Sequence, residues 1–188
     1  MISLDERFKE LRAQLGEPAT LNPAKSDPLF YFVYPVAQML ELKRRVPIWA
    51  VQLRNEGFDV VRISFSELLW QLVDESGRYG PWLDLEAGAD VEQINEAVRE
   101  VLRREDLLAE EVAARIDRAS ENGVVLLTET EMLHPYFRTR TIESKLHDRV
   151  RVPTVIFYPG RRSGQYGLHF LEFYPVDGNY RSTLIGGA

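Results

Sequence analysis

The sequence predicts an α/β fold of three layers, in which helices cover both faces of a mostly parallel sheet and a C-terminal antiparallel hairpin completes it. Continuous apolar runs typical of buried strands alternate along the chain with segments of helical periodicity, which is the pattern of a covered parallel sheet. The last two runs are separated by only about nine residues, too few for a parallel crossover, so these strands should pair antiparallel.

The N-terminal part predicts a helix followed by a strand. Residues 4–15 place apolar side chains on one helix face, and Ser3 with Glu6 three positions later has the pattern of a capping box. A loop rich in turn-forming residues follows. Residues 29–34 are uninterruptedly apolar and aromatic, and Pro35 closes this run, which indicates a buried strand.

A helical stretch and a second strand come next. Residues 36–55 have a helical composition, and we expect Pro47 to split them into two segments because proline has no backbone N–H to donate. Residues 60–65 predict the second strand, and Ser66 is placed to cap a short helix over residues 67–74.

A helical insert of roughly residues 75–120 is expected between the second and third strands. Its first part, residues 75–89, has the glycines of a loop. Asp90 then opens a helical region whose apolar side chains recur at intervals of three and four. Residues 124–128 form a short apolar run and predict the third strand.

The C-terminal part predicts one more helix and the two strands of the hairpin. Residues 139–149 have a helical composition. Residues 152–158 predict the fourth strand, with Pro153 near its start, where a missing donor is tolerated. Residues 168–174 predict the fifth strand.

Size and composition indicate one globular domain spanning residues 1–188. Hydrophobic residues make up 45% and charged residues 28%, both near the globular average. No apolar run approaches the roughly 18 residues of a membrane helix, and the charged start lacks the apolar core of a secretory signal, so we expect a cytoplasmic protein. The absence of cysteine excludes disulfides and thiolate chemistry, and with three histidines we expect neither a metal nor a cofactor.

Charge is divided unevenly along the chain. The net charge of −6 argues against a general nucleic-acid coat, yet residues 134–165 carry +5 while residues 1–133 carry −10. Arginine, whose planar fork suits carboxylate and phosphate, dominates the basic segment. Its seven basic residues are Arg138, Arg140, Lys145, Arg149, Arg151, Arg161 and Arg162. They predict either a surface for an anionic partner or an ordinary solvated face.

The predicted sheet should gather three segments at one edge. In such folds ligands lie beyond the carboxyl ends of the parallel strands. Residues 34–35, 129–134 and 159–167 each follow a predicted strand. We therefore expect two acids, one histidine and an arginine pair to share this edge, and the basic residues to form one continuous positive rim there.

The glycine-rich segment 159–167 allows two interpretations. Its glycines could aim backbone amides at a phosphate, but the lysine and the following helix of a Walker motif are missing, and no dinucleotide-binding glycine pattern follows the first strand. A wide hairpin loop with glycine turns is therefore the favoured interpretation.

The acidic segment after the third strand also has two interpretations. Glu129, Glu131 and His134 could carry out acid–base chemistry or hold magnesium. Alternation along an extended segment places the two glutamates on the same side, but nothing supplies a third ligand. A polar strand exit with a turn at His134-Pro135 is favoured, and no nucleophile elbow is present. His147 has the position of a helix C-terminal cation.

Several segments together resemble a known family, and the strongest is Val152-Pro153-Thr154-Val155-Ile156-Phe157-Tyr158-Pro159-Gly160. The others are Asp27-Pro28-Leu29-Phe30-Tyr31 up to Pro35, Leu126-Leu127-Thr128 followed by His134-Pro135-Tyr136-Phe137-Arg138, Leu168 to Phe173, and Asn179-Tyr180-Arg181. On these segments, from about residue 3 to residue 183, the chain resembles the BrxB family, a small component of the BREX bacteriophage-exclusion systems of prokaryotes.

The resemblance implies a role in antiviral defence inside the cytoplasm, among other BREX proteins. These include a PglZ-type protein with an alkaline-phosphatase-like fold, a large ATPase and a DNA methyltransferase. The family offers no catalytic residues to carry over, which agrees with the incomplete catalytic patterns of this chain. We therefore do not expect an enzyme.

Three functional hypotheses follow, and the first is a non-enzymatic component that docks with other BREX proteins, most readily the PglZ-like one. Aromatic and arginine side chains dominate interface energetics. The predicted docking residues are Tyr136, Phe137, Arg138, Arg140, Arg161, Arg162 and Tyr166. The second hypothesis is DNA or RNA binding through the basic rim of residues 138–162, and the third is a nucleotide-binding enzyme at the sheet edge.

Overall fold

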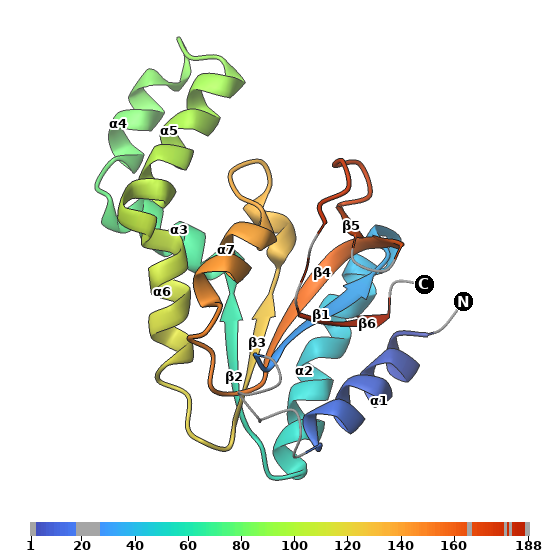
Figure 1. Ribbon diagram of the computed structural model, residues 1–188. Helices are drawn as coiled ribbons and strands as arrows, with labels where there is room; N and C mark the ends of the chain where they lie inside the picture. Colours follow the sequence, from blue (N-terminus) through green and yellow to red (C-terminus); the bar gives the residue numbers. More distant parts are fainter. Residues whose placement is uncertain (1–2, 18–26, 165–166, 179, 181, 187–188) are drawn as a thin grey trace.

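The computed structural model, which describes residues 3–17, 27–164, 167–178, 180 and 182–186, has the predicted α/β fold (Figure 1). One six-stranded sheet has the order β2-β3-β4-β1-β6, and β5 pairs with β4 off this path. Every pairing within that order is parallel, whereas β4 and β5 pair antiparallel, as predicted. The strands are β1 Leu29–Tyr34, β2 Asp59–Ser64, β3 Gly123–Thr128, β4 Thr154–Ser163, β5 Gly167–Phe170 and β6 Thr183–Gly186.

Helices lie on both faces of the sheet and make the three predicted layers (Figure 1). The α-helices are α1 Leu4–Leu15, α2 Met39–Asn55, α3 Phe65–Glu75, α4 Tyr79–Glu86, α5 Val91–Arg103, α6 Leu107–Ile116 and α7 Thr139–Leu146. Short 3-10 helices among the described residues are Val36–Gln38, Arg104–Asp106 and Thr130–Leu133. The hairpin of α4 and α5 extends beyond the layers, above the carboxyl ends of the strands (Figure 1).

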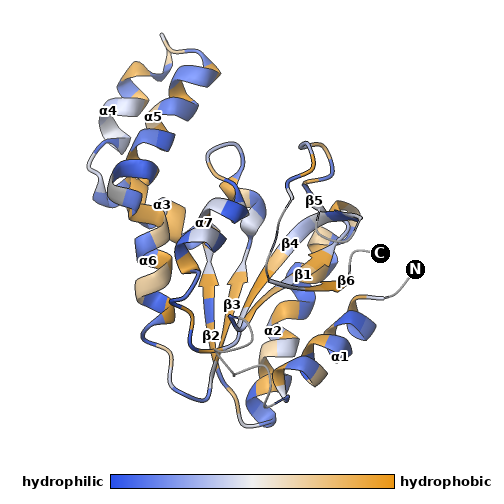
Figure 2. Cartoon of the chain, viewed as in Figure 1, coloured by the Kyte–Doolittle hydropathy of each residue, from blue (hydrophilic) through white to orange (hydrophobic). Residues whose placement is uncertain are grey.

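Two apolar cores lie on the two faces of the sheet, because adjacent residues of a strand point in opposite directions. Phe32 and Phe157 pack with α1 and α2, whereas Tyr31 and Tyr158 pack on the face covered by α3, α6 and α7. Trp49 of α2 lies within the first core. β1 and β3 are therefore buried along their whole length and largely hydrophobic (Figure 2), which is why their sequence shows continuous apolar runs.

The first helix begins where the sequence predicts, but the second helix is not split. Ser3 and Glu6 form the expected capping box of α1. Pro47 lies inside a continuous α2. A proline inside a helix lowers stability by about 3 kcal/mol. The burial of Trp49 and Leu53, which follow Pro47 in α2, offsets this loss, so tertiary packing overrides the local penalty.

Three further predictions about elements are corrected. Residues 79–86 of the expected loop form α4. β5 ends at Phe170, four residues before the predicted end, because Leu171 and Glu172 adopt left-handed backbone angles, with φ of 53° and 62°. The four-residue strand β6, which pairs with β1 at the sheet edge, was not predicted.

The segment after the fourth strand is also more regular than predicted. β4 continues to Ser163, so Arg161 and Arg162 lie on a strand and not in a wide hairpin loop. Gly164, with a φ of 64°, begins the turn that leads to β5.

Candidate docking site

The two glutamates after β3 are engaged by a lysine from the opposite layer. Lys43 Nζ of α2 lies 3.5 Å from Glu129 Oε1 and 2.7 Å from Glu131 Oε1, so both carboxylates face the same cation. The segment is not extended as expected, because Glu129 is left-handed and Thr130–Leu133 form a 3-10 helix. The Ser64 hydroxyl, at the end of β2, donates a hydrogen bond to Glu129. The hydrogen bond to Glu131 raises the pKa of Lys43, and burial opposes this increase without cancelling it. This group joins α2 to the ends of β2 and β3.

His134 does not join these acids. Thr130, between the two glutamates, turns the other way, and its hydroxyl donates a hydrogen bond to the Phe157 carbonyl at 2.5 Å. His134 Nδ1 is hydrogen-bonded to the Tyr174 hydroxyl instead. The three residues proposed for acid–base chemistry or metal binding are therefore divided between an ion-paired group and a separate aromatic cluster.

The aromatic cluster, here called the aromatic face, consists of His134, Arg138, Phe173 and Tyr174. The ring centroids of Phe173 and Tyr174 are 4.4 Å apart and stacked, and His134 meets both rings edge-on. The Arg138 guanidinium carbon lies 3.3 Å from the Tyr174 ring centroid. Phe173 is 64% exposed. The cluster combines an arginine held in place with an uncovered aromatic side chain.

The electrostatics of the aromatic face favour a neutral histidine. Burial, and to a smaller degree the nearby Arg138 charge, lowers the pKa of His134. A neutral imidazole can stack and accept or donate one hydrogen bond without a charge of its own.

The expected continuous positive rim is interrupted by ion pairs. Arg140 Nη1 lies 2.6 Å from Asp177 Oδ1, Lys145 Nζ lies 2.5 Å from Asp106 Oδ2, and Arg149 Nη1 lies 2.9 Å from Glu110 Oε1. These acids lie far from their partners in the sequence, so the pairing could not be predicted from local charge counts. The prediction of one unopposed basic patch is corrected accordingly.

The arginine pair of β4 also diverges. Arg161 and Arg162 are adjacent in a strand and therefore point to opposite faces of the sheet. Arg162 Nη1 lies 3.5 Å from the Gly186 carbonyl, and Arg161 is exposed. Of the aromatic docking residues, Phe137 lies beneath Arg103, whose guanidinium carbon is 6.0 Å from the ring centroid, and Tyr166 lies outside the described residues.

An apolar groove lies beside the aromatic face and was missed by the sequence analysis. This insert groove has a volume of about 740 Å³ and shares His134 with the aromatic face. It is lined by Leu69, Trp70, Val73, Tyr79, Trp82, Leu83, Leu85, Glu86, Gly88, Ala89, Gln93, Ile94, Ala97, Val98, Met132, His134 and Tyr136. The predicted docking residue Tyr136 is among them. The apolar residues of the segment predicted as a loop were the signal that could have indicated this groove.

A smaller cavity lies beneath Arg138. Its volume is about 190 Å³, and Tyr158 and Tyr180 line it. The Tyr158 hydroxyl is buried without a hydrogen-bond partner of good geometry, and burial raises its pKa far above the ordinary value. Burial and, less strongly, Asp177 raise the pKa of Tyr180 to about 12. The site therefore holds neutral tyrosines.

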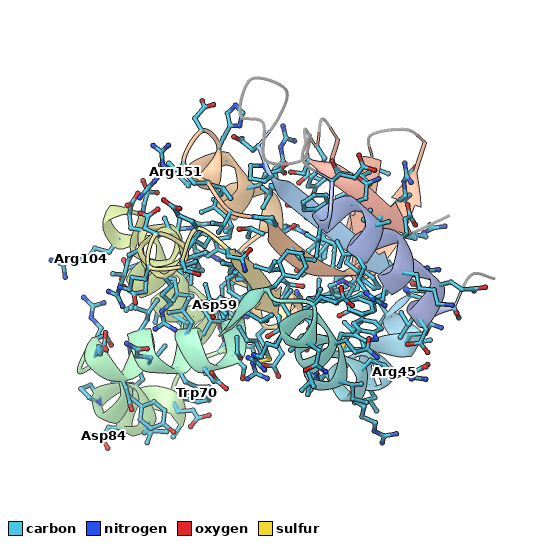
Figure 3. The ribbon with its side chains drawn as sticks, turned by 90° about the horizontal axis from the view of Figure 1, so that it is seen from below. Arg45, Asp59, Trp70, Asp84, Arg104 and Arg151 are labelled. Carbon is cyan, nitrogen blue, oxygen red and sulfur yellow. The ribbon has the colours of Figure 1, made fainter. Side chains whose placement is uncertain are left out.

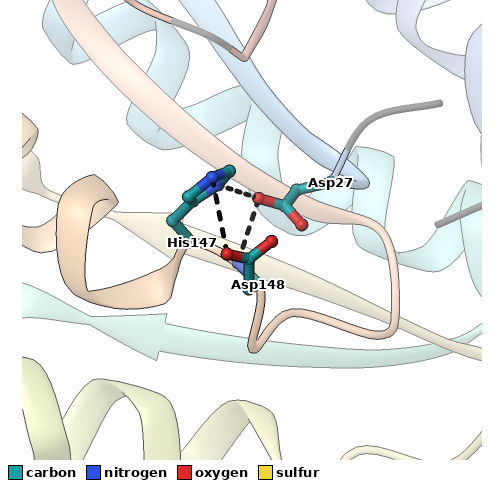
Figure 4. Close-up of side chains that lie close together, drawn as sticks. All are labelled: Asp27, His147 and Asp148. Atoms are coloured by element: carbon teal, nitrogen blue, oxygen red, sulfur yellow. Dashed lines mark hydrogen bonds and ion pairs between the residues drawn. The ribbon is translucent and has the colours of Figure 1, made fainter. Parts of the chain in front are cut away.

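A group of three polar side chains lies at the opposite, amino-terminal end of the strands (Figure 4). One carboxylate oxygen each of Asp27 and Asp148 and one ring nitrogen of His147 lie within 4.8 Å of one another. His147 is the C-cap of α7, as its predicted place requires, and is hydrogen-bonded to Asp27. The Asp148 backbone N–H donates to the same carboxylate at 3.2 Å. These bonds attach the segment before β1 to the end of α7.

Within the described part of the chain, no helix is long and apolar enough to cross a membrane. Among known protein families, the family described as BREX protein BrxB matches residues 61–185. This span runs from β2 to β6 and contains the aromatic face and the insert groove. No curated protein and no solved structure matches the chain.

Proposed function

The chain belongs to the BrxB family of BREX phage-defence components, and we propose that it acts there by docking with other BREX proteins, without catalysing a reaction itself. The PglZ-like protein is the partner we propose first. The acids at the strand ends support a structural role, because Lys43 and Ser64 engage Glu129 and Glu131. The cytoplasm is the proposed location.

The observation that carries this proposal is the aromatic face. Aromatic and arginine side chains are enriched at the energetic centres of protein interfaces. Phe173 is largely exposed although it is stacked on Tyr174, and Arg138 is already held over the same ring. Because these side chains are ordered before a partner arrives, docking would lose little rotamer entropy.

The test is a calorimetric titration of the PglZ-like protein of the same system with this chain. We expect the double variant Arg138→Ala, Phe173→Ala to weaken binding about 30-fold or more, which corresponds to a total loss of about 2 kcal/mol or more, because interface centres dominate the binding energy. The matched control is Arg118→Ala, Val51→Ala, which removes one exposed arginine and one exposed apolar side chain elsewhere. Unchanged affinity of the first variant would contradict this site, and an absence of wild-type binding would contradict this partner.

The four predicted arginines need separate tests. Reversing the charge of Arg140 would repel Asp177. Because the backbone of Asp177 pairs with Leu168 of β5, this change would also disturb the hairpin itself. Arg138 and the exposed Arg161 carry no such consequence. We expect Arg138→Ala to weaken docking. The effect of Arg161→Ala on docking measures the contribution of the β4–β5 hairpin apart from that of the aromatic face.

Nucleic-acid binding through residues 138–162 has weaker support, because Arg140, Lys145 and Arg149 are paired with acids. Binding of this kind would fall with salt at a slope of about −0.9 per phosphate contacted. A filter-binding titration with duplex and single-stranded DNA and RNA at low salt tests it. For the nucleotide-binding alternative, a thermal-shift screen with nucleotides and magnesium is the matching experiment.

A further inference from the structure

The insert groove exposes several large apolar side chains. Trp70 of α3 is 56% exposed and Leu85 of α4 is 67% exposed, and Leu83 and Tyr79 are also exposed. Trp70 and Tyr79 meet edge-on at 5.9 Å between ring centroids, so the wall is ordered. Contiguous exposed apolar patches of this kind mark interaction sites.

The shape of the groove suits a helix better than a small ligand. Its walls are α3, the hairpin of α4 and α5, and the segment from Met132 to Tyr136. Small-ligand pockets bury most of the ligand surface, whereas several side chains that form these walls are more than half exposed. A groove between helices is filled naturally by one row of apolar side chains from another helix.

The charge around the groove indicates which charge a helix that binds there should carry. Residues 74–104 contain eight acidic and four basic residues, a net charge of −4. Two of the four basic residues are ion-paired within the insert, Arg99 with Glu92 and Glu96, and Arg78 with Glu100. Trp70 and Asp84 lie on this side of the molecule, away from Arg45 (Figure 3).

A second copy of this chain is a poor occupant by the same reasoning. Two inserts facing each other would bring equal negative charge together, and like charges oppose association. An occupant with lysine or arginine beside its apolar row would instead meet the exposed acids Asp84 and Glu86 of α4.

We propose that the insert groove binds an amphipathic helix of a partner protein, with leucine-sized side chains in the groove and lysine or arginine along the flanks. The inference deepens the proposed function, since it rests on docking with other proteins. The insert is then a second docking surface beside the aromatic face.

Two synthetic 18-residue helical peptides test the groove without any BREX protein. Both carry the same leucine row; the flanks are lysine and arginine in one and glutamate in the other. Trp70 and Trp82 line the groove, so binding should shift tryptophan emission to shorter wavelength. We expect the basic peptide to bind at least tenfold more tightly than the acidic one at low salt, and the ratio to fall at 0.5 M salt as exposed charges are screened.

Variants of the full chain test whether the peptide binds in the insert groove. We expect Leu83→Asp and, independently, Trp70→Ser to weaken binding of the basic peptide tenfold or more. The control Val91→Asp adds the same charge to an exposed apolar position of the hairpin outside the groove lining, and should bind as the wild type does. Far-ultraviolet circular dichroism checks that each variant keeps its helix content.

The outcomes separate the proposals. Equal binding of both peptides, or binding of neither, would overturn the inference. So would a concentration-dependent dimer that Leu83→Asp abolishes, because the occupant would then be a second copy. Peptide binding that survives Arg138→Ala, Phe173→Ala, together with loss of PglZ-like binding in that variant, would support both surfaces as distinct sites. Intact peptide binding with no PglZ-like binding by the wild type would sink only the proposed partner.

Discussion

The helices α2 and α4 both carry a tryptophan and leucine side chains, but α2 buries its tryptophan and one apolar face, whereas α4 buries none of its residues. Trp49 of α2 is 2% exposed and stacks with Phe8 at 4.5 Å between ring centroids. None of the residues of α4 is buried. Because burial of apolar surface is the main force that stabilises a fold, α2 contributes to stability, whereas α4 leaves its apolar surface available for a partner.

The largest expected difference concerns two tryptophans, Trp49 of the buried core and Trp70 of α3, which lines the insert groove. We expect Trp49→Ala to lower the free energy of unfolding by about 3–5 kcal/mol, because it leaves a cavity between α1, α2 and the sheet. Trp70→Ala should change it by about 1 kcal/mol or less, because the side chain is already half exposed. Urea denaturation of the two variants measures both values, and similar losses would contradict the division between the core and the insert groove.

Ion pairs at the strand ends provide the next comparison. Lys43→Met leaves the mostly buried Glu131 without its cation, and we expect a loss of about 1–2 kcal/mol. The control Arg62→Met breaks an exposed pair of the same length, 2.7 Å, with Glu67, and should cost about 0.5 kcal/mol or less. Thermal and urea denaturation check this order; a larger loss for Arg62→Met would show that burial does not govern these pairs.

The same capping box occurs in both regions and allows a matched test. Ser3 and Glu6 cap α1 in the body, while Asp90 and Gln93 cap α5 in the insert. We expect Ser3→Ala to lower global stability by about 1 kcal/mol. Asp90→Ala should instead increase hydrogen exchange within α4 and α5 and change global stability less, because the hairpin of α4 and α5 is mostly exposed. Equal global losses would indicate that the insert unfolds only with the body.

The smallest expected effect is the pH response of the aromatic face. The pKa of His134 is lower in the folded protein than its ordinary value of 6.5, chiefly through burial. The unfolded chain therefore binds the proton more readily, so the contribution of His134 to stability is present above pH 6.5 and is lost as pH falls through the folded pKa. His134→Gln should lose slightly less stability than the wild type between pH 7 and 5. A steeper loss in this variant would contradict the sign.

The sequence predicted the body of the fold better than the insert, for a physical reason. Strands buried on both faces, such as β1 and β3, must be apolar throughout, and this requirement is visible in any window of sequence. The residues of α4 satisfy no such requirement, since none of them is buried by the part of the chain that the structure describes, and glycines at both ends resemble a loop. The four-residue β6 is too short to leave a pattern.

The candidate site was predicted in composition but not in arrangement. Arg138 and Tyr136 were chosen from the sequence, and they lie at the aromatic face and the insert groove. Phe173 was expected to lie in a strand, and it became exposed because left-handed residues end β5 before it. The partners of Arg140 and Arg149 lie 37 and 39 positions away, so local charge could not show that these arginines are neutralised.

The sequence by itself determined the α/β class, the parallel sheet with its C-terminal hairpin, the first helix cap and the resemblance to the BrxB family, because periodicity and capping depend on residues a few positions apart. The tertiary structure alone decided that Pro47 stays within α2, that the basic residues are divided among ion pairs, and that an apolar groove opens beside His134. These features depend on contacts between side chains that are distant in the sequence, and the packing of the whole chain determines those contacts.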